Sequence, residues 1–447
     1  MRYTGRMDED EDQGDATRAD AAKTPPEPRL LTPRVRGSGA RVRATSTFRQ
    51  TFKSLENRDF RYLWLGMLAM MSSIQMAQVS TGYLVYDITG SASLLGLVSA
   101  AQAAPMLLLS PFGGAVADRF ERKRVIQAGQ AVAGILGLVV ALSISLGWVT
   151  WVHLLAVSLV YGVVFSFTMP SRQSLIPQLV EKDQLTNAMA LNGTVLSATY
   201  LVAPAIAGGL YALVGPTIVF YIIAGLGFVA VALTGFLPNR PGSGEGTERA
   251  MLRDIGEGLR YILRDPLIRV ILVMTIATTL LSMPFRYVAP AVVVDVYHRG
   301  PDSLGLLISI MGLGSVVGSL VIASVGRWKR GLLLIAAGLP SGIALVVVAS
   351  VPIYVVAVVI MLMLGVGEVM RRTLTHSLMI EHADEKYRGR VISIYLTTFG
   401  LVPLAVFPAG VAIEYIGARE TLGFLGGGLL LVTAVLWFTQ RKLRAMP

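Results

Sequence analysis

The chain has 447 residues, of which 53% are hydrophobic and 15% are charged, and its formal net charge is +11. Soluble domains average about 25% charged residues, so the composition excludes an ordinary soluble protein and indicates a membrane protein. Cysteine is absent, which excludes disulfide bonds and cysteine-ligated metal sites.

The amino-terminal stretch is polar, rich in charge and interrupted by Pro and Gly. It contains no apolar run of the length that a signal peptide needs, and it cannot bury enough surface to fold alone. We expect residues 1–60 to form a disordered cytoplasmic tail. A solvated tail is the simpler interpretation, and contact of its basic part with anionic lipid is the alternative.

Twelve apolar segments follow this tail. A helix needs about 20 apolar residues to cross the hydrocarbon core of a bilayer. Backbone groups without hydrogen bonds are too unstable in lipid for any irregular structure to span it. The sequence therefore predicts twelve transmembrane helices, at residues 62–86, 94–117, 125–146, 152–168, 188–213, 217–237, 267–294, 304–325, 332–349, 353–370, 391–413 and 421–439.

Lysine and arginine give these predicted helices an orientation. If the loops alternate between two sides, Arg299 and Arg419 fall on one side and Arg286 within a helix, which leaves 36 of the 39 Lys and Arg on the other side. Basic loops mark the cytoplasmic side, so both termini are predicted to be cytoplasmic. The net charge then reflects membrane topology, and we expect no binding of nucleic acid.

The longest predicted loop within the chain, residues 238–266, divides it into two sets of six helices. Its first part is rich in Gly and polar residues and is typical of a flexible linker. Its second part places Leu252, Ile255, Leu259 and Ile262 three or four residues apart. This spacing predicts a short amphipathic helix that lies along the membrane surface.

The two sets of helices show a weak internal repeat at an offset of about 200 residues. Residues 169–192 are similar to 369–393, and residues 204–215 are similar to 408–417. Two halves related by duplication place a substrate cavity at their interface, near the middle of the bilayer.

A dense charged motif, "PFGGAVADRFERKR" at residues 111–124, lies between the second and third predicted helices. It resembles the signature Gly-x-x-x-Asp-Arg-x-Gly-Arg-Arg/Lys of the major facilitator superfamily, with Glu121 in place of the second Gly. The matching residues are Gly114, Asp118, Arg119, Arg122 and Lys123.

Other phrases narrow this resemblance. "LVYDITGSASLLGL", "EKDQLTNAMALN" and "EKYRGRVIS" are similar to bacterial enterobactin exporters and macrolide-efflux proteins, and the likeness covers about residues 60–441. It implies an all-α integral membrane protein with twelve transmembrane helices in two pseudo-symmetric six-helix bundles. The expected parts after the tail are a first bundle at 61–237, a linker at 238–266, a second bundle at 267–440 and a cytoplasmic tail at 441–447.

The charged motif is expected to form a gate at the cytoplasmic side. A carboxylate beside a helix N-terminus is stabilised by about 0.3–1 kcal/mol when exposed and up to about 2 kcal/mol when partly buried. The resemblance implies that Asp118 lies at the start of the eleventh helix, with Arg119 and Arg122 paired to acidic groups of adjacent loops. The alternative is that these charges only set the membrane topology.

Sequence patterns for catalysis and for ATP binding are missing. The chain lacks the phosphate-binding GxxxxGK[ST] pattern and the HExxH and GxSxG patterns, and its four His have no metal-ligand grouping. We therefore expect no catalytic residues, no cofactor and no metal, and we expect an ion gradient to supply the energy.

Polar residues inside the predicted helices are candidates for function, because they are unfavourable in lipid. Gln75, Gln78 and Gln102 lie at similar depth, and Gln75 and Gln78 share one helix face. We expect all three to line a substrate cavity, and hydrogen bonding between helices is the alternative. Arg286 follows Pro284, which is expected to kink the seventh helix. An arginine there needs water, an anion or a carboxylate, so Arg286 is a candidate for substrate binding and for coupling.

Three carboxylates are further coupling candidates. Asp87 and Asp295 lie at the outer ends of the first and seventh predicted helices, and either is a candidate partner for Arg286. Glu368 lies one turn before a pair of arginines in the tenth helix. A local ion pair is the favoured interpretation of Glu368, and a protonatable coupling site is the alternative.

Two further family patterns bear on the direction of transport. The antiporter signature Gly-Pro-x-x-Gly-Gly resembles residues 203–208, where Pro204 and Gly208 are kept and Ala203 and Ala207 replace Gly. This favours export. The arginine that many proton-coupled drug antiporters carry in the fourth helix is replaced by Ser158.

The expected function is that of a bacterial inner-membrane exporter that works by alternating access. It would be driven by protons or another ion and would move a siderophore, a macrolide-like drug or another amphipathic small molecule, as a monomer in the lipid bilayer. The alternatives are a solute importer of the same fold and a sensor or scaffold that transports nothing.

Overall fold

The computed structural model describes residues 52–239, 248–326 and 329–444, which form helices and turns without any strand in these ranges. Most of the predicted tail, residues 1–51, lies outside the described residues. The first long helix, α2 (Arg58–Thr89), begins within the predicted tail. It begins there because the Asn57 side chain accepts hydrogen bonds from the backbone N–H groups of Asp59 and Phe60, and because Phe60 is buried.

The first half of the protein, residues 52–239, contains five long helices. Gly215, with φ 79° and ψ 169°, breaks the longest of them, and Pro216 follows at the start of the next helical stretch. This break separates the two spans predicted on either side of it. The elements are η1 (Lys53–Glu56), α2, α3 (Ala92–Arg119), α4 (Arg122–Ser145), α5 (Trp151–Leu179) and α6 (Leu185–Gly235).

The second half, residues 248–444, has more interruptions. Pro284 begins a new helix after a break at Met283, at the position of the predicted kink. A 3-10 turn, η2 (Thr398–Leu401), interrupts the eleventh predicted span. The helices are α7 (Glu248–Arg264), α8 (Pro266–Ser282), α9 (Pro284–Asp295), α10 (Pro301–Val325), α11 (Arg330–Ala336), α12 (Gly338–Ser350), α13 (Tyr354–His382), α14 (Arg388–Thr397), α15 (Pro403–Ile416), α16 (Ala418–Thr439) and α17 (Arg441–Arg444).

The described helices are those of a membrane protein. Nine helical segments in the described ranges are long and apolar enough to cross a membrane by length and composition. One of them, α6, covers two predicted spans, and the predicted spans 62–86 and 391–413 are not among the nine. Each of the twelve predicted segments lies largely within helix. The count of twelve transmembrane helices stays a prediction.

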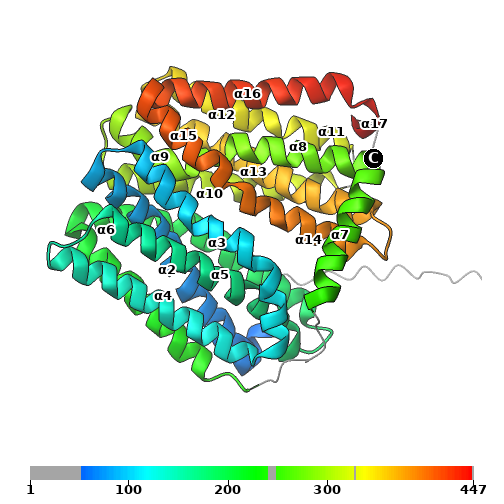
Figure 1. Ribbon diagram of the computed structural model, residues 1–447, viewed down its shortest axis with the longest axis horizontal. Helices are drawn as coiled ribbons and strands as arrows, with labels where there is room; N and C mark the ends of the chain where they lie inside the picture. The colour runs from blue at the N-terminus through cyan, green and yellow to red at the C-terminus, as the bar shows by residue number, and fades with distance from the viewer. Residues whose placement is uncertain (1–51, 240–247, 327–328, 445–447) are drawn as a thin grey trace, which may run out of the picture. The chain divides into compact units, whose positions relative to one another are not determined.

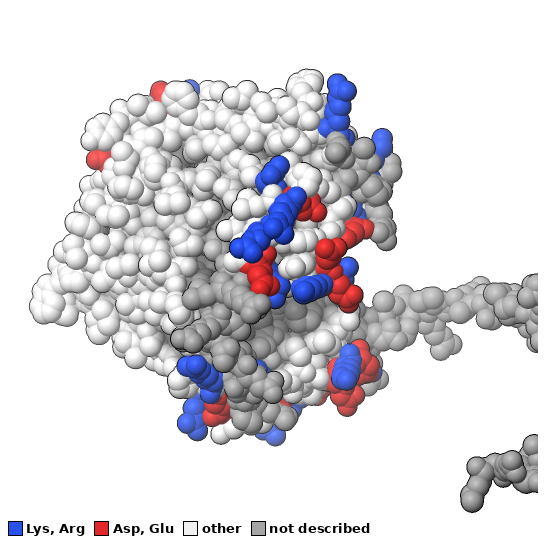
Figure 2. Space-filling model, turned by 45° about the vertical axis from the view of Figure 1, so that its right-hand side comes forward, with Lys and Arg blue, Asp and Glu red and all other residues white. Residues whose placement is uncertain are grey.

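Charged side chains mark one end of the helices. Figure 2 shows them gathered at one end, with few on the rest of the described surface in that view. We call this the basic end, and it is defined by Arg119, Arg124, Arg264, Arg330 and Arg390. The opposite end, called the far end, carries the turns at Gly90, Gly147, Gly215 and Gly417. All four glycines have positive φ, which allows the chain to reverse over a few residues.

The two halves meet along two pairs of helices (Figure 1). Within the first half α2 packs on α6 and α3 on α5, and within the second half α10 packs on α13 and α12 on α16. Between the halves, α6 packs on α10 and α3 packs on α15. The interface between the halves therefore runs between helices about 100 and 300 residues apart in sequence.

The amphipathic helix α7 packs against the second half. Glu257 forms a salt bridge of 2.8 Å with Arg390 of α14, and the rings of Tyr261 and Tyr387 stack with centroids 4.4 Å apart. Ile262 is buried, whereas Leu259 is exposed. Figure 1 shows α7 beside α14. The predicted surface helix thus uses part of its apolar face to contact the protein.

Candidate functional site

A small central cavity lies between the two halves. It has a volume of about 50 Å³ and is lined by residues of α2, α3 and α5 from the first half and of α9 and α10 from the second half. Gln78, Gln102 and Arg286 are among these lining residues. Each lies nine to eleven residues from the far end of its helix. At 1.5 Å per residue this is about 15 Å, half the thickness of a hydrocarbon core.

Arg286 of α9 contacts residues of the first half. Its Nη2 donates a hydrogen bond of 3.4 Å to Oε1 of Gln78, and its guanidinium carbon lies 4.7 Å from the centre of the Tyr200 ring. The ring faces a cation, which is a favourable cation–π geometry. Arg286 forms no salt bridge with any residue that the structure describes.

The predicted glutamines separate into two environments. Gln78 and Gln102 line the central cavity together with Arg286. Gln75 does not line it, although it shares a helix face with Gln78. Its side chain is 5% exposed, and its Nε2 has no hydrogen-bond partner among the described residues. Gln75 lies about one helical turn before Gln78, and at that position its side chain packs in the interior instead of lining the cavity.

Asp87 and Asp295 do not pair with Arg286 within the described structure. Asp87 is exposed at the end of α2. Asp295 accepts a hydrogen bond of 2.6 Å from the Tyr86 hydroxyl at the far end. Arg286 lies nine residues before Asp295 on α9, or about 14 Å along the helix axis, and this separation excludes direct contact.

Glu368 of α13 lies within electrostatic range of Arg371 but forms no salt bridge with it in the described structure. Nη1 of Arg371 instead donates a hydrogen bond of 2.6 Å to Oγ1 of Thr279, across the packed interface with α8. Glu368 is half-buried and has no hydrogen bond or salt bridge to a described residue. It lies within electrostatic range of Tyr287, which lines the central cavity beside Arg286.

Polar contacts join the halves at the far end. Oε2 of Glu414, near the end of α15, accepts hydrogen bonds from Oγ of Ser91 at 2.7 Å and from the backbone N–H of Ser93 at 2.9 Å. Ser91 is the N-cap of α3, so the Glu414 carboxylate lies at the positive end of that helix. The hydrogen bond from Tyr86 to Asp295 joins α2 to α9 at the same end.

Glycine contacts bring the helices of the two halves close together. A Cβ atom added at Gly208 of α6 would overlap the Pro301 carbonyl oxygen and the backbone of Gly305 on α10. A Cβ atom at Gly410 of α15 would overlap the backbone of α3 near Gly96. Pro204 and Gly208, the kept residues of the antiporter pattern, therefore lie at the crossing of α6 and α10.

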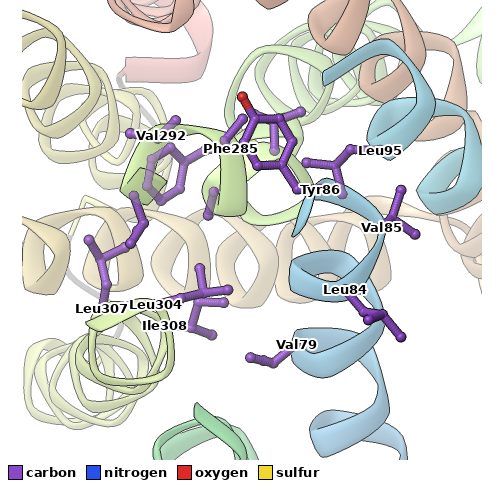
Figure 3. Packing of buried hydrophobic residues seen from close by; sticks show 14 of the residues in the cluster. Val79, Leu84, Val85, Tyr86, Leu95, Phe285, Val292, Leu304, Leu307 and Ile308 are labelled. Carbon is purple, nitrogen blue, oxygen red and sulfur yellow. The ribbon is translucent and has the colours of Figure 1, made fainter. Parts of the chain in front are cut away.

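An apolar cluster fills the space between these crossings. Its buried members come from both halves. Figure 3 shows Tyr86 of α2 beside Phe285 of α9, and Val79 of α2 on the side of Leu304 and Ile308 of α10. Together with the polar and glycine contacts, this cluster packs the two halves against each other toward the far end.

The predicted gate at the basic end is described in part. Arg119 is exposed and Arg122 is buried. Nζ of Lys123 donates hydrogen bonds to the carbonyl oxygen of Leu237 and to Oδ1 of Asn239. The surroundings of Gly114 and the side chain of Asp118 lie outside the described part of the structure. The predicted contact of Asp118 with the eleventh helix stays a prediction.

Four lining or neighbouring residues were not predicted as cavity residues, although the sequence places Ser158 at the position of the drug-antiporter arginine. Ser158 and Tyr161 of α5 and Tyr287 of α9 line the central cavity, and Tyr200 of α6 packs against Arg286. Hydroxyl and aromatic side chains are common in membrane helices, so their type gives no signal. Their position relative to Arg286 becomes visible only in three dimensions.

Comparison with known proteins decides the family. The sequence profile of the Major Facilitator Superfamily matches residues 63–408. The chain belongs to the major facilitator superfamily. It is therefore a multi-pass membrane transporter and not an enzyme.

Relatives within the superfamily include named exporters. Macrolide efflux protein A of Streptococcus pyogenes is 23% identical over 389 residues, which are 84% of this chain and 94% of that protein. The enterobactin exporter EntS of Citrobacter koseri is 24% identical over 337 residues, which are 75% of this chain and 80% of that protein. The resemblance to exporters of these two kinds is confirmed.

The fold is that of known superfamily structures. A bacterial homologue of the human lysosomal transporter Spinster, solved in an inward-facing and occupied conformation, superposes with a TM-score of 0.70 at 13% identity. The match covers 88% of this chain and 99% of that one. An all-α major facilitator fold is confirmed.

Proposed function

We propose that this protein is a proton-driven exporter of the bacterial inner membrane. It moves a siderophore, a macrolide-like drug or another amphipathic small molecule by alternating access. The support is the central cavity at mid-bilayer depth, which holds Arg286 and is shared by both halves. The names of the relatives favour export over import.

The contacts between the halves support alternating access. With the far end closed by Glu414, Asp295 and the glycine crossings, substrate enters the cavity from the basic end. Opening the far end requires these contacts to separate while the basic end closes. The charged motif with Asp118, Arg119 and Arg122 is the proposed gate that holds the basic end closed in that second state.

Glu368 is the proposed proton carrier. Glu368 is a half-buried carboxylate inside a membrane helix and forms no salt bridge with a described residue, and acidic residues in such positions form the proton relays of pumps and transporters. Its electrostatic contact with Tyr287 links it to the wall of the cavity. Asp87 and Asp295 lie at the far end, away from the cavity, and are weaker candidates.

An efflux assay in everted membrane vesicles tests this proposal. Vesicles with an imposed acidic interior should accumulate a labelled siderophore or macrolide, and Glu368→Gln should abolish the effect of the pH gradient. Glu420→Gln is the control, because Glu420 is an exposed carboxylate at the far end. Accumulation that is independent of Glu368 would exclude this residue as the carrier. Uptake only in right-side-out vesicles would indicate an importer, and no movement of any solute would indicate a sensor or scaffold.

A further inference from the structure

The central cavity has an unusual charge for a site that binds amphipathic molecules. Arg286 is the charged residue in its described lining, which otherwise offers glutamine amides, hydroxyl groups and apolar side chains. No Asp or Glu is among the described lining residues. The cavity therefore carries a net positive charge at mid-bilayer depth.

No carboxylate of the described structure forms a salt bridge with Arg286, although Glu368 lies within electrostatic range of the neighbouring Tyr287. The hydrogen bond from Arg286 to Gln78 is long at 3.4 Å, and the Tyr200 ring provides only a cation–π contact. Asp295 is engaged with Tyr86, and Glu368 makes no salt bridge. An arginine inside the membrane normally faces water, a carboxylate or another anion. A guanidinium with free donors in a low dielectric attracts negative charge and repels positive charge.

A second arginine lines a neighbouring cavity beside α2. Arg172 of α5 is 9% exposed and lines a cavity of about 20 Å³ beside α2. Its Nη2 contacts Sδ of Met169 at 2.7 Å, and thioether sulfur is a weak acceptor. It has no salt bridge to a described residue. Ile74 lines both this cavity and the central one, so the two are neighbours along α2.

The wall opposite Arg172 is apolar and adaptable. Met67, Met70 and Met71 of α2 line this second cavity. Methionine side chains are flexible and polarizable, and they fit apolar groups of different shapes. The two cavities thus combine unpaired positive charges with a deformable apolar surface.

We propose that the cargo is an amphipathic anion, with a carboxylate or another acidic group held by Arg286 and an apolar body against the methionines of α2. This rests on the proposed function and narrows it: acidic, siderophore-like molecules are favoured over cationic drugs. Arg172 forms a second contact for the anion between the basic end and the central cavity.

Binding of two probes of opposite charge tests this proposal. The full chain in lipid nanodiscs is titrated with dansylglycine, which carries a carboxylate, and with N-(2-aminoethyl)dansylamide, which carries an ammonium group on the same fluorophore. We expect dansylglycine to bind at least about tenfold more tightly, equivalent to about 1.4 kcal/mol. Arg286→Gln should remove this preference, and Arg286→Lys should keep most of it. Arg172→Gln should reduce it by a smaller factor.

Arg299→Gln is the matched control. Arg299 also lies over a tyrosine ring, 5.7 Å from the centre of Tyr354, but it is exposed at the far end and outside the cavity. Its substitution should leave the preference for the anion unchanged. Equal or tighter binding of the ammonium probe would overturn the proposal. So would a preference that survives in Arg286→Gln, or no binding of dansylglycine to the folded protein.

Transport of the same probes by proteoliposomes separates the two proposals. If the ammonium probe moves and the carboxylate probe does not, export stands and the anion proposal fails. If the carboxylate probe binds selectively through Arg286 but no probe moves under any gradient, the anion site stands and the transport function fails.

Discussion

Substitution of Glu414 by Gln should weaken closure of the far end. The Glu414 carboxylate lies at the N-terminus of α3 and accepts two hydrogen bonds from that helix. An amide can keep the hydrogen bonds but loses the negative charge. An exposed charge at a helix terminus contributes about 0.3–1 kcal/mol. A loss at the upper end of this range corresponds to an increase of about fivefold in the ratio of far-end-open to far-end-closed molecules.

Pulsed electron resonance between spin labels can measure this ratio. The natural chain has no cysteine, so Trp148→Cys and Val355→Cys give one label on each half at the far end. Both positions are well exposed, at 69% and 67%. Glu414→Gln should increase the population with long label distances. Glu420→Gln, which changes the same charge in the same region without a contact between the halves, should not. Identical distance distributions for the two variants would refute the role of Glu414.

Three further predictions concern packing, a partly buried hydrogen bond and the driving force. Gly208→Ala should lower the melting temperature, because overpacking costs about 1–3 kcal/mol, whereas Gly209→Ala, with open space around it, should not; equal effects would contradict the crossing of α6 and α10. Tyr86→Phe removes the hydrogen bond to Asp295, whose carboxylate is exposed and can be solvated by water, and should destabilise the protein by about 0.5–1.5 kcal/mol in thermal unfolding; an unchanged midpoint would contradict this. If the cargo is a monovalent anion, an inside-positive potential of about 100 mV in everted vesicles contributes about 2.3 kcal/mol per charge moved and should raise accumulation without a pH gradient, whereas an insensitive flux would indicate electroneutral exchange of a cation for a proton and would contradict an anionic cargo.

The sequence predicts the helices well because hydropathy determines which segments enter lipid. The turn at Gly215 and the break before Pro284 were both expected at these residues. Glycine readily adopts the positive φ of a turn, and proline has no N–H to continue the hydrogen bonds of the preceding helix. The 3-10 turn at Thr398–Leu401 was not expected. The contact of α7 with Arg390 was also missed, because an amphipathic pattern does not reveal whether its apolar face meets lipid or protein.

The site was predicted in part. Buried polar side chains stand out in an apolar sequence, and three of the four proposed cavity residues share one cavity. Whether a residue such as Gln75 lines the cavity or packs against another helix depends on where the neighbouring helices lie. A single sequence does not contain this information. The same limit applies to Glu368. Helical spacing permits a salt bridge between Glu368 and Arg371, but in the structure Arg371 donates hydrogen bonds to hydroxyl groups of α8.

The central cavity, at about 50 Å³, has room for little more than water. Pockets that hold drug-sized ligands measure about 300–1,000 Å³. An arriving molecule must therefore push helices apart, so part of its contact energy is consumed in deforming the protein. Measured binding should then be weaker than the contacts in the complex alone would give. Bulky molecules should associate slowly. A variant that enlarges the space next to Arg286 should bind them faster and hold them longer.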